Sequence, residues 1–217
     1  MNRKEYRNLI FDFNGTLVND VDICFNILNE MLTLTGHPTV DMNTYLHIFT
    51  FPVYDYYQKA GFDLKGKDDF GKLADYFTGH YLQGFPSLKT YPEVIPTLKK
   101  YYGSKRLFIL SATREDLLEK QVNVLGISSY FDDIIGIRNI YASSKIKTAE
   151  EYFGAHPEIR MNETLFIGDT LHDDEVAKDL QAASVLVAKG HQAKDVLTRD
   201  PKHIVLDSLS DLDKIIA

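Results

Sequence analysis

The 217-residue sequence has one cysteine, no tryptophan and no long apolar segment. The single cysteine, Cys24, cannot form an internal disulfide, and it lies in an apolar pattern of helical spacing that indicates core packing. No N-terminal apolar segment has the character of a secretion signal, and no apolar run is long enough to cross a membrane. These absences predict a soluble cytoplasmic protein with no membrane partner.

Clusters of basic residues are also missing. The chain has 24 lysines and arginines against 31 aspartates and glutamates, and its formal net charge is -7. Proteins that bind phosphate backbones usually carry a surplus of positive charge, so nucleic acid is not an expected partner. Repeats, low-complexity tracts and flexible linkers are absent as well, and the length suits one domain with an inserted module.

Polar groups stand at the ends of several short apolar runs. Asp12 follows the run 9–11 and is followed by Asn14, Gly15 and Thr16. The run 107–110 leads into Ser111, Ala112 and Thr113, and the run 164–167 leads into Gly168 and Asp169. In open parallel sheets, ligands bind beyond the carboxyl ends of the strands. Reactive groups placed at several strand ends therefore predict one shared site.

Strand and helix patterns alternate from about residue 88 onward. This alternation predicts an α/β fold, a doubly wound parallel sheet with helices on both faces. Further strands are expected at 134–137, 185–187 and 204–206, and helices at 91–101, 115–125, 144–153 with Gly154 as the end, 174–182 and 209–216.

Residues 18–87 have a different character, with helical patterns only. Four helices are expected, at 20–35, 42–49, 53–60 and 70–82, and the region is rich in aromatic residues. Most of these rings are expected to fill the core of a small bundle, while one or two, Phe51 first among them, could line a substrate pocket. The predicted division is an α/β core of residues 1–17 and 88–217 with a helical insertion of residues 18–87.

The order and spacing of these motifs resemble the haloacid dehalogenase superfamily of phosphohydrolases. Asp12 to Thr16 resembles the motif Asp-x-Asp-Gly-Thr, Ser111 the lone hydroxyl after a strand, Lys145 the third motif, and Gly168 to Asp173 the motif Gly-Asp-x-x-x-Asp. The resemblance covers nearly the whole chain and implies that residues 18–87 form a cap over the active site. One departure stands out, because Asn14 replaces the second Asp of the first motif.

The resemblance implies a nucleophilic role for Asp12, beside a Mg²⁺ ion. A carboxylate that attacks an anionic phosphate ester needs a cation between them, and Mg²⁺ prefers oxygen ligands. Asp12 and Asp169 are the predicted carboxylate ligands, Asn14 would contribute its backbone carbonyl, and Asp173 would hold water on the metal or Lys145. Asp169 could instead cap the following helix, and Asp173 could be a first-turn carboxylate favoured by the helix dipole.

The remaining predicted site residues bind the phosphoryl group. Ser111 would donate its hydroxyl, the Ala112 backbone N–H would assist, and Lys145 would supply positive charge. Lys147 is the competing lysine, but the two would point to nearly opposite sides of a helix, and Lys145 is nearer the strand ends. His172 and His191 are candidates for substrate contact or, alternatively, for solvated or hydrogen-bonded histidines.

The predicted function is a Mg²⁺-dependent phosphatase that cleaves a small phosphorylated metabolite through an aspartyl-phosphate on Asp12. Because Asn14 cannot exchange protons near neutral pH, good leaving groups should be preferred and Asn14→Asp should speed the cleavage of alkyl phosphates. The alternatives are a phosphonatase-type or dehalogenase-type hydrolase, a phosphomutase, and a phosphate-binding regulatory protein without turnover. No sequence pattern identifies the substrate or the oligomeric state.

Overall fold

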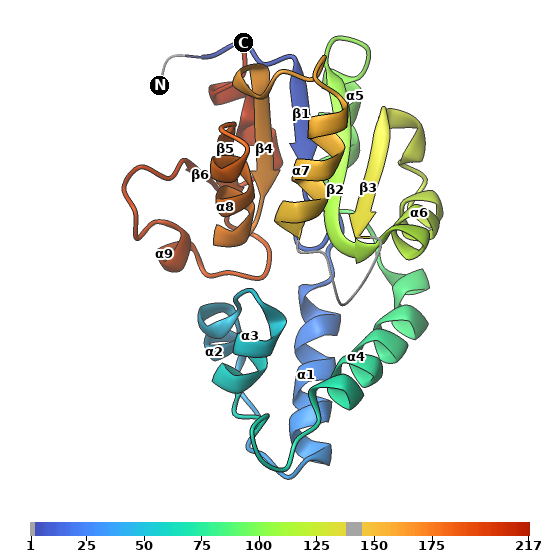
Figure 1. The fold of residues 1–217 in the computed structure, drawn as a ribbon, viewed down its shortest axis with the longest axis vertical. Helices are drawn as coiled ribbons and strands as arrows, with labels where there is room; N and C mark the ends of the chain where they lie inside the picture. The colour runs from blue at the N-terminus through green and yellow to red at the C-terminus, as the bar shows by residue number, and fades with distance from the viewer. Residues whose placement is uncertain (1–2, 138–144) are drawn as a thin grey trace.

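One parallel sheet of six strands forms the centre of the core, in the order β3-β2-β1-β4-β5-β6 (Figure 1). The computed structural model describes residues 3–137 and 145–217. The strand order reverses at β1, and this confirms the predicted doubly wound parallel sheet. The strands are β1 (Asn8–Phe11), β2 (Arg106–Arg114), β3 (Asp133–Ile137), β4 (Thr164–Gly168), β5 (Ala183–Val187) and β6 (Val205–Leu206).

Successive side chains of the central strands belong alternately to two separate apolar layers. Ile10, Phe108 and Phe166 belong to one layer, and their neighbours Leu9, Leu107 and Leu165 belong to the other. A strand buried on both faces must be apolar throughout, which explains the continuous apolar runs in the sequence. The first layer is covered by α7 (Lys145–Ala155) and α8 (Leu171–Asp179), and the second by α5 (Val94–Tyr101), α6 (Glu115–Val124) and the 3₁₀ segment η4 (Leu209–Lys214).

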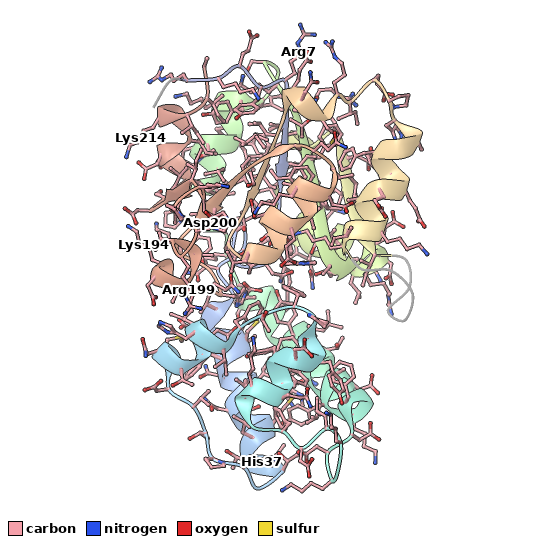
Figure 2. The ribbon with its side chains drawn as sticks, turned by 60° about the vertical axis from the view of Figure 1, so that its left-hand side comes forward. Arg7, His37, Lys194, Arg199, Asp200 and Lys214 are labelled. Carbon is pink, nitrogen blue, oxygen red and sulfur yellow. The ribbon has the colours of Figure 1, made fainter. Side chains whose placement is uncertain are left out.

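The cap helices lie together beyond the carboxyl ends of the strands (Figure 1). His37 marks their far end, and Arg7 marks the opposite end of the molecule (Figure 2). The four helices occupy the expected places, while the division of the chain into two domains stays a prediction. They are α1 (Val21–Leu34), α2 (Met42–Ile48), α3 (Val53–Ala60) and α4 (Phe70–Gly84), followed by the 3₁₀ turn η1 (Phe85–Ser87). No helix in the described parts of the chain has the length and apolar character that a membrane span requires.

Several element boundaries differ from the sequence prediction. β2 continues through the expected loop residues to Arg114, with a register shift against β3 between Leu110 and Arg114. α8 begins at Leu171, three residues early, because Asp173 accepts a hydrogen bond from the Thr170 backbone N–H and closes a capping box. The first turn of α8 therefore belongs to the fourth motif.

The other differences lie near the chain's later helices. α7 runs through Gly154 to Ala155, since a glycine near a helix end costs little when the backbone stays helical. Its expected first residue, Ser144, lies outside the described residues. The terminal segment is a 3₁₀ helix, and a short helix, α9 (Lys194–Leu197), was not predicted because four residues carry too little periodicity.

Candidate active site

The register of the sheet brings Asp12 and Asp169 to the same edge. Phe11, the last residue of β1, pairs with Ile167 of β4 and Ile109 of β2. The Asp12 backbone N–H donates to the Ile167 carbonyl at 2.8 Å, so Asp12 lies one step beyond the end of β1. Asp169 stands directly after β4, at the point where the strand order reverses. This is where open α/β sheets bind their ligands.

Lys145 enters this edge from the first turn of α7. Its side chain is buried, its Nζ atom contacts the Asp12 carboxylate, and Nζ lies 2.5 Å from Asp173 Oδ1. Lys147 is exposed on the same helix and lies 3.9 Å from Glu151. The structure thus brings Lys145, and not Lys147, to the strand ends.

Three carboxylates cluster at this edge, and two of them, Asp12 and Asp173, contact the Lys145 ammonium. One oxygen from each of Asp12, Asp169 and Asp173 lies within 4.8 Å of the other two. Asp169 accepts hydrogen bonds from Thr16 Oγ1 at 3.1 Å and from the His191 backbone N–H at 2.6 Å. Asp169 does not cap α8, whose N-cap is Thr170, whereas Asp173 is indeed a first-turn carboxylate and also pairs with Lys145. Asp173 is therefore both a first-turn carboxylate of α8 and a partner of Lys145.

The electrostatic balance of the cluster favours a further cation. Burial raises the pKa of Asp12 to about 8, although Lys145 opposes the shift. Burial also raises the pKa of Asp169 to about 6, against the opposing effect of His191. For Asp173, Lys145 overcomes the effect of burial and holds the pKa below its ordinary value. The Lys145 ammonium does not offset the effect of burial on Asp12, so a divalent cation with oxygen ligands would fit beside it.

Gly15 allows the first motif to approach Asp169 closely. Its φ is +72°, a region that favours glycine. A Cβ atom at this position would lie 2.4 Å from Asp169 Oδ2 and 2.7 Å from His191 Cδ2. The turn after Asp12 therefore needs a glycine for both its conformation and its space.

The Asn14 side chain is held on all sides by protein groups. Nδ2 donates to Asp20 Oδ2 at 2.7 Å and to the Tyr81 hydroxyl at 2.8 Å, and these two bonds use both of its hydrogens. Oδ1 accepts from Thr113 Oγ1 at 3.0 Å. In this arrangement the Asn14 side chain has no donor left for a substrate.

Ser111 and Ala112 lie within β2 and not after it, two and three residues beyond Ile109, which pairs with Phe11. Ser111 is buried and its Oγ accepts a hydrogen bond from the Thr113 backbone N–H at 3.1 Å. Ala112 is half-buried beside it. The Ser111 hydroxyl hydrogen can still be donated, which is what its predicted phosphate-binding role needs.

The comparison with known proteins agrees with this geometry. The sequence model of the haloacid dehalogenase-like hydrolases matches residues 9–187. The chain belongs to this family. It is 22% identical to a phosphoglycolate phosphatase from Vibrio parahaemolyticus, covering 100% of this chain and 99% of the relative, and 23% identical to the pyrophosphatase PpaX from Halalkalibacterium halodurans, covering 98% and 97%. A haloacid dehalogenase-like hydrolase from Streptococcus pneumoniae has the same fold, with a TM-score of 0.80, 21% identity and coverage of 96% and 98%.

Asp20 is a site residue of this hydrolase that the sequence did not reveal. Its carboxylate is fully buried and accepts hydrogen bonds from the Gly15 backbone N–H at 2.9 Å and from the Tyr81 hydroxyl at 2.8 Å, besides that from Asn14. It stands where the helical pattern of α1 begins, which indicates a capping residue. The side chain makes no capping bond, however, because it turns toward the first motif. A polar residue at a helix start was the available signal, but it pointed to a different role.

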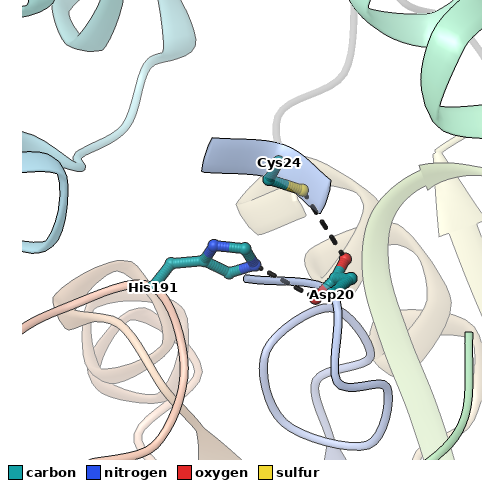
Figure 3. Close-up of side chains that lie close together, drawn as sticks. All are labelled: Asp20, Cys24 and His191. Carbon is teal, nitrogen blue, oxygen red and sulfur yellow. Dashed lines mark hydrogen bonds and ion pairs between the residues drawn. The ribbon is translucent and has the colours of Figure 1, made fainter. Parts of the chain in front are cut away.

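Figure 3 shows Cys24 on α1 and His191 on the loop after β5, both directed at Asp20. His191 Nε2 lies 3.2 Å from Asp20 Oδ1, and Cys24 Sγ lies 3.9 Å from Asp20 Oδ2. Burial raises the pKa of Asp20, but the His191 imidazole and the hydrogen bonds around it bring the pKa below its ordinary value. Asp, Cys and His side chains are common metal ligands. Both carboxylate oxygens of Asp20, however, already accept hydrogen bonds from protein groups. We interpret the cluster as a hydrogen-bonded ion pair.

Aromatic residues of the cap contact the α/β core of the hydrolase. Phe51 stacks on His172, with ring centroids 4.7 Å apart and an interplanar angle of 26°. Phe49 stacks on His191, also at 4.7 Å, with an angle of 18°. His172 Nδ1 lies 2.9 Å from Glu175 Oε2, so both histidines make hydrogen bonds. Phe51, the predicted substrate-pocket residue, thus lies against the first turn of α8.

Proposed function

We propose that this hydrolase is a Mg²⁺-dependent phosphatase that forms an aspartyl-phosphate on Asp12. The observation that carries the proposal is the convergence of Asp12, Asp169 and Asp173 at the switch point of the sheet, with Lys145 in contact with Asp12 and Asp173. The substrate class that fits is a small phosphorylated metabolite, since the cap helices lie over this edge of the sheet.

The residues present fit a Mg²⁺ ion. Asp12, Asp169 and Asp173 offer hard oxygen donors within 4.8 Å of one another, and burial strengthens their need for a counter-charge. The family resemblance adds the backbone carbonyl of Asn14. When bound, Mg²⁺ would neutralise carboxylate charge and polarise the phosphoryl group.

The chemistry of the chain's own residues follows from their positions. An Asp12 carboxylate oxygen attacks phosphorus, a new O–P bond forms, and the bond to the leaving group breaks with its electron pair on the leaving oxygen. Lys145 and the Ser111 hydroxyl bind the phosphoryl oxygens on which negative charge gathers, assisted by the Ala112 backbone N–H. Water then attacks phosphorus, its proton passes to solvent, and orthophosphate is released as Asp12 is restored.

The hydrogen bonds of Asn14 bear on the substrate class. Acid help at this step contributes roughly 10²–10⁴ in rate, and Asn14 can give neither a proton nor a hydrogen bond while it binds Asp20 and Tyr81. We infer a preference for leaving groups that depart without a proton, as in acyl phosphates, phosphoanhydrides and activated aryl esters. One relative is named a pyrophosphatase, and pyrophosphate is such an anhydride.

The alternative chemistries find less support among the described residues. A phosphonatase of this family would be expected to form a Schiff base with a cap lysine directed into the site. All the cap lysines, Lys59, Lys65, Lys67 and Lys72, are exposed, and Lys67 donates to the Thr35 carbonyl near the far end of the cap. A regulatory protein without turnover would have no need for the buried contact between Asp12 and Lys145.

The test is a panel of acetyl phosphate, pyrophosphate, 4-nitrophenyl phosphate and phosphoglycolate, assayed with Mg²⁺ and with excess EDTA. Asp12→Asn should abolish turnover because it removes the nucleophile and a metal ligand together. Asp22→Asn is the matched control, since Asp22 is an exposed carboxylate on α1. Turnover that survives EDTA or Asp12→Asn would exclude the aspartyl-phosphate mechanism.

A further inference from the structure

The loop after β5 contacts the metal motif and the cap at the same time. The His191 backbone N–H donates to Asp169, while its Nδ1 lies 2.7 Å from the Tyr45 hydroxyl of α2. Gln192, the next residue, repeats this arrangement with its side chain. Its Oε1 accepts from the Leu171 backbone N–H at 2.8 Å, and its Nε2 donates to the Phe49 carbonyl at 2.7 Å.

Both ends of the Gln192 amide have defined partners. A backbone N–H can only donate and a carbonyl can only accept, so the orientation of the amide is fixed by Leu171 and Phe49. Gln192 is buried, and a buried amide that loses a partner is destabilised by about 1–3 kcal/mol. Leu171 is the first residue of α8, two residues after Asp169 and two before Asp173. Undocking of the cap would therefore remove one of the two partners that hold this amide directly beside the metal motif.

We propose that Gln192 is a positioning residue that couples docking of the cap to the geometry of Asp169 and Asp173. The inference rests on the proposed function, in which these carboxylates hold Mg²⁺. Because coupling between two binding events is reciprocal, Mg²⁺ favours the docked cap and the docked cap favours Mg²⁺. The metal ligands are then best aligned when the cap is docked on the core.

A second contact between cap and core supplies a control. His47 Nε2 lies 3.1 Å from an Asp195 carboxylate oxygen, and both side chains are largely exposed. No hydrogen bond of this pair involves the segment from Gly168 to Asp173. Loss of the His47 side chain should therefore loosen the cap without changing the metal ligands.

The experiment uses three variants of the full chain. Gln192→Met keeps the length of the side chain and removes both hydrogen bonds. Gln192→Glu keeps an acceptor for the Leu171 N–H, and in its ionised form, which a titration at high pH favours, it cannot donate to the Phe49 carbonyl. His47→Ala is the control. Calorimetric titration with Mg²⁺ alone measures metal affinity, and hydrogen exchange of residues 42–56 with and without Mg²⁺ measures docking of the cap.

In the native protein, Mg²⁺ should slow hydrogen exchange in residues 42–56. Gln192→Met should weaken Mg²⁺ binding by about threefold to tenfold, as for a lost neutral hydrogen bond, and should abolish the effect of Mg²⁺ on exchange. Gln192→Glu should bind Mg²⁺ no more weakly than the native protein, yet lose that effect. His47→Ala should exchange faster throughout, but because the cap stays docked most of the time it should keep a near-native Mg²⁺ affinity and the response to Mg²⁺.

Native Mg²⁺ affinity in Gln192→Met, together with a native exchange response, would overturn the coupling while leaving the proposed function intact. The same conclusion follows if Mg²⁺ binds the native protein without slowing exchange in the cap. A native protein that binds no Mg²⁺ would instead refute the proposed function. If circular dichroism shows that Gln192→Met does not fold, Gln192→Glu decides, and a persistent exchange response in that variant overturns the coupling.

Discussion

Asn14→Asp tests the environment of the first motif most directly. The change replaces an amide nitrogen, 2.7 Å from Asp20 Oδ2, with a carboxylate oxygen. Two ionised carboxylates at this distance would repel each other by about 6 kcal/mol at an effective dielectric constant of 20. Protonation of one carboxyl group at pH 7 costs about 4 kcal/mol, taking an ordinary pKa of about 3.9. Because protonation costs less than the repulsion between two ionised groups, the variant should fold with one proton shared between the carboxyl groups of positions 14 and 20.

The pH dependence has a definite sign. The carboxyl group introduced at position 14 has a raised pKa in the folded state, so the folded protein holds a proton that the unfolded chain releases. Stability should therefore fall as pH rises, by about 1.4 kcal/mol per pH unit until the folded pKa is reached. The loss relative to the native protein should be about 1.5 kcal/mol at pH 5 and up to about 4 kcal/mol at pH 7.

Urea unfolding followed by circular dichroism at the two pH values measures this difference. The double variant Asn14→Asp/Asp20→Asn restores one carboxylate and one amide, so it should recover much of the stability lost at pH 7. The proton of the single variant is directed at Asp20, so its gain on alkyl phosphates should stay below about tenfold, short of the roughly 10²–10⁴ that general acid help contributes, and the double variant should exceed it. A stability loss that does not change between pH 5 and pH 7 would refute the contact between positions 14 and 20.

Three further predictions concern other parts of the molecule. Lys145→Ala should lower kcat/KM by on the order of 10²-fold, as for one preorganised electrostatic group, while Lys147→Ala stays near native; the reverse order would assign the role to Lys147. Phe51→Ala should change the order of preferred substrates at unchanged Mg²⁺ affinity, and uniform losses on all substrates would show a purely structural role. Lys189 and Ser208 keep the pKa of Glu93 below its ordinary value despite burial, so the stability loss in Glu93→Gln, about 1 kcal/mol at pH 7, should shrink as the pH falls below the ordinary glutamate pKa of about 4.3 and vanish below the lowered folded-state pKa.

The strand ends of the site could be predicted because their signals are local. Asp12, Ser111 and Asp169 each follow or lie within a continuous apolar run, and parallel strands must bring such positions to one edge. Lys145 could be preferred over Lys147 because helix geometry separates their directions. The boundaries were harder, since β2 passes through Ser111 and α8 begins at a capping box that the apolar pattern does not show.

The contacts around Asn14 and Gln192 could not be predicted in the same way. Asn14 meets Tyr81 across 67 residues, and Gln192 meets Phe49 across 143 residues. Such pairs depend on how the cap docks on the core, and no periodic pattern records this. Asp20 illustrates the difficulty, because its position at the start of α1 indicates a helix cap, while its side chain binds Asn14, Gly15 and His191 of the core.

The chain enters the cap near Asp20 and leaves it near Tyr81, and Asn14 of the core binds both residues. These contacts limit how freely the cap can be replaced by the cap of another protein. A chimaera that grafts a foreign cap onto this core would carry its own residues at both crossings. Unless these residues include a carboxylate and a hydroxyl in the same places, the Asn14 amide would lose its partners. Replacement of the cap therefore calls for a matching change at position 14.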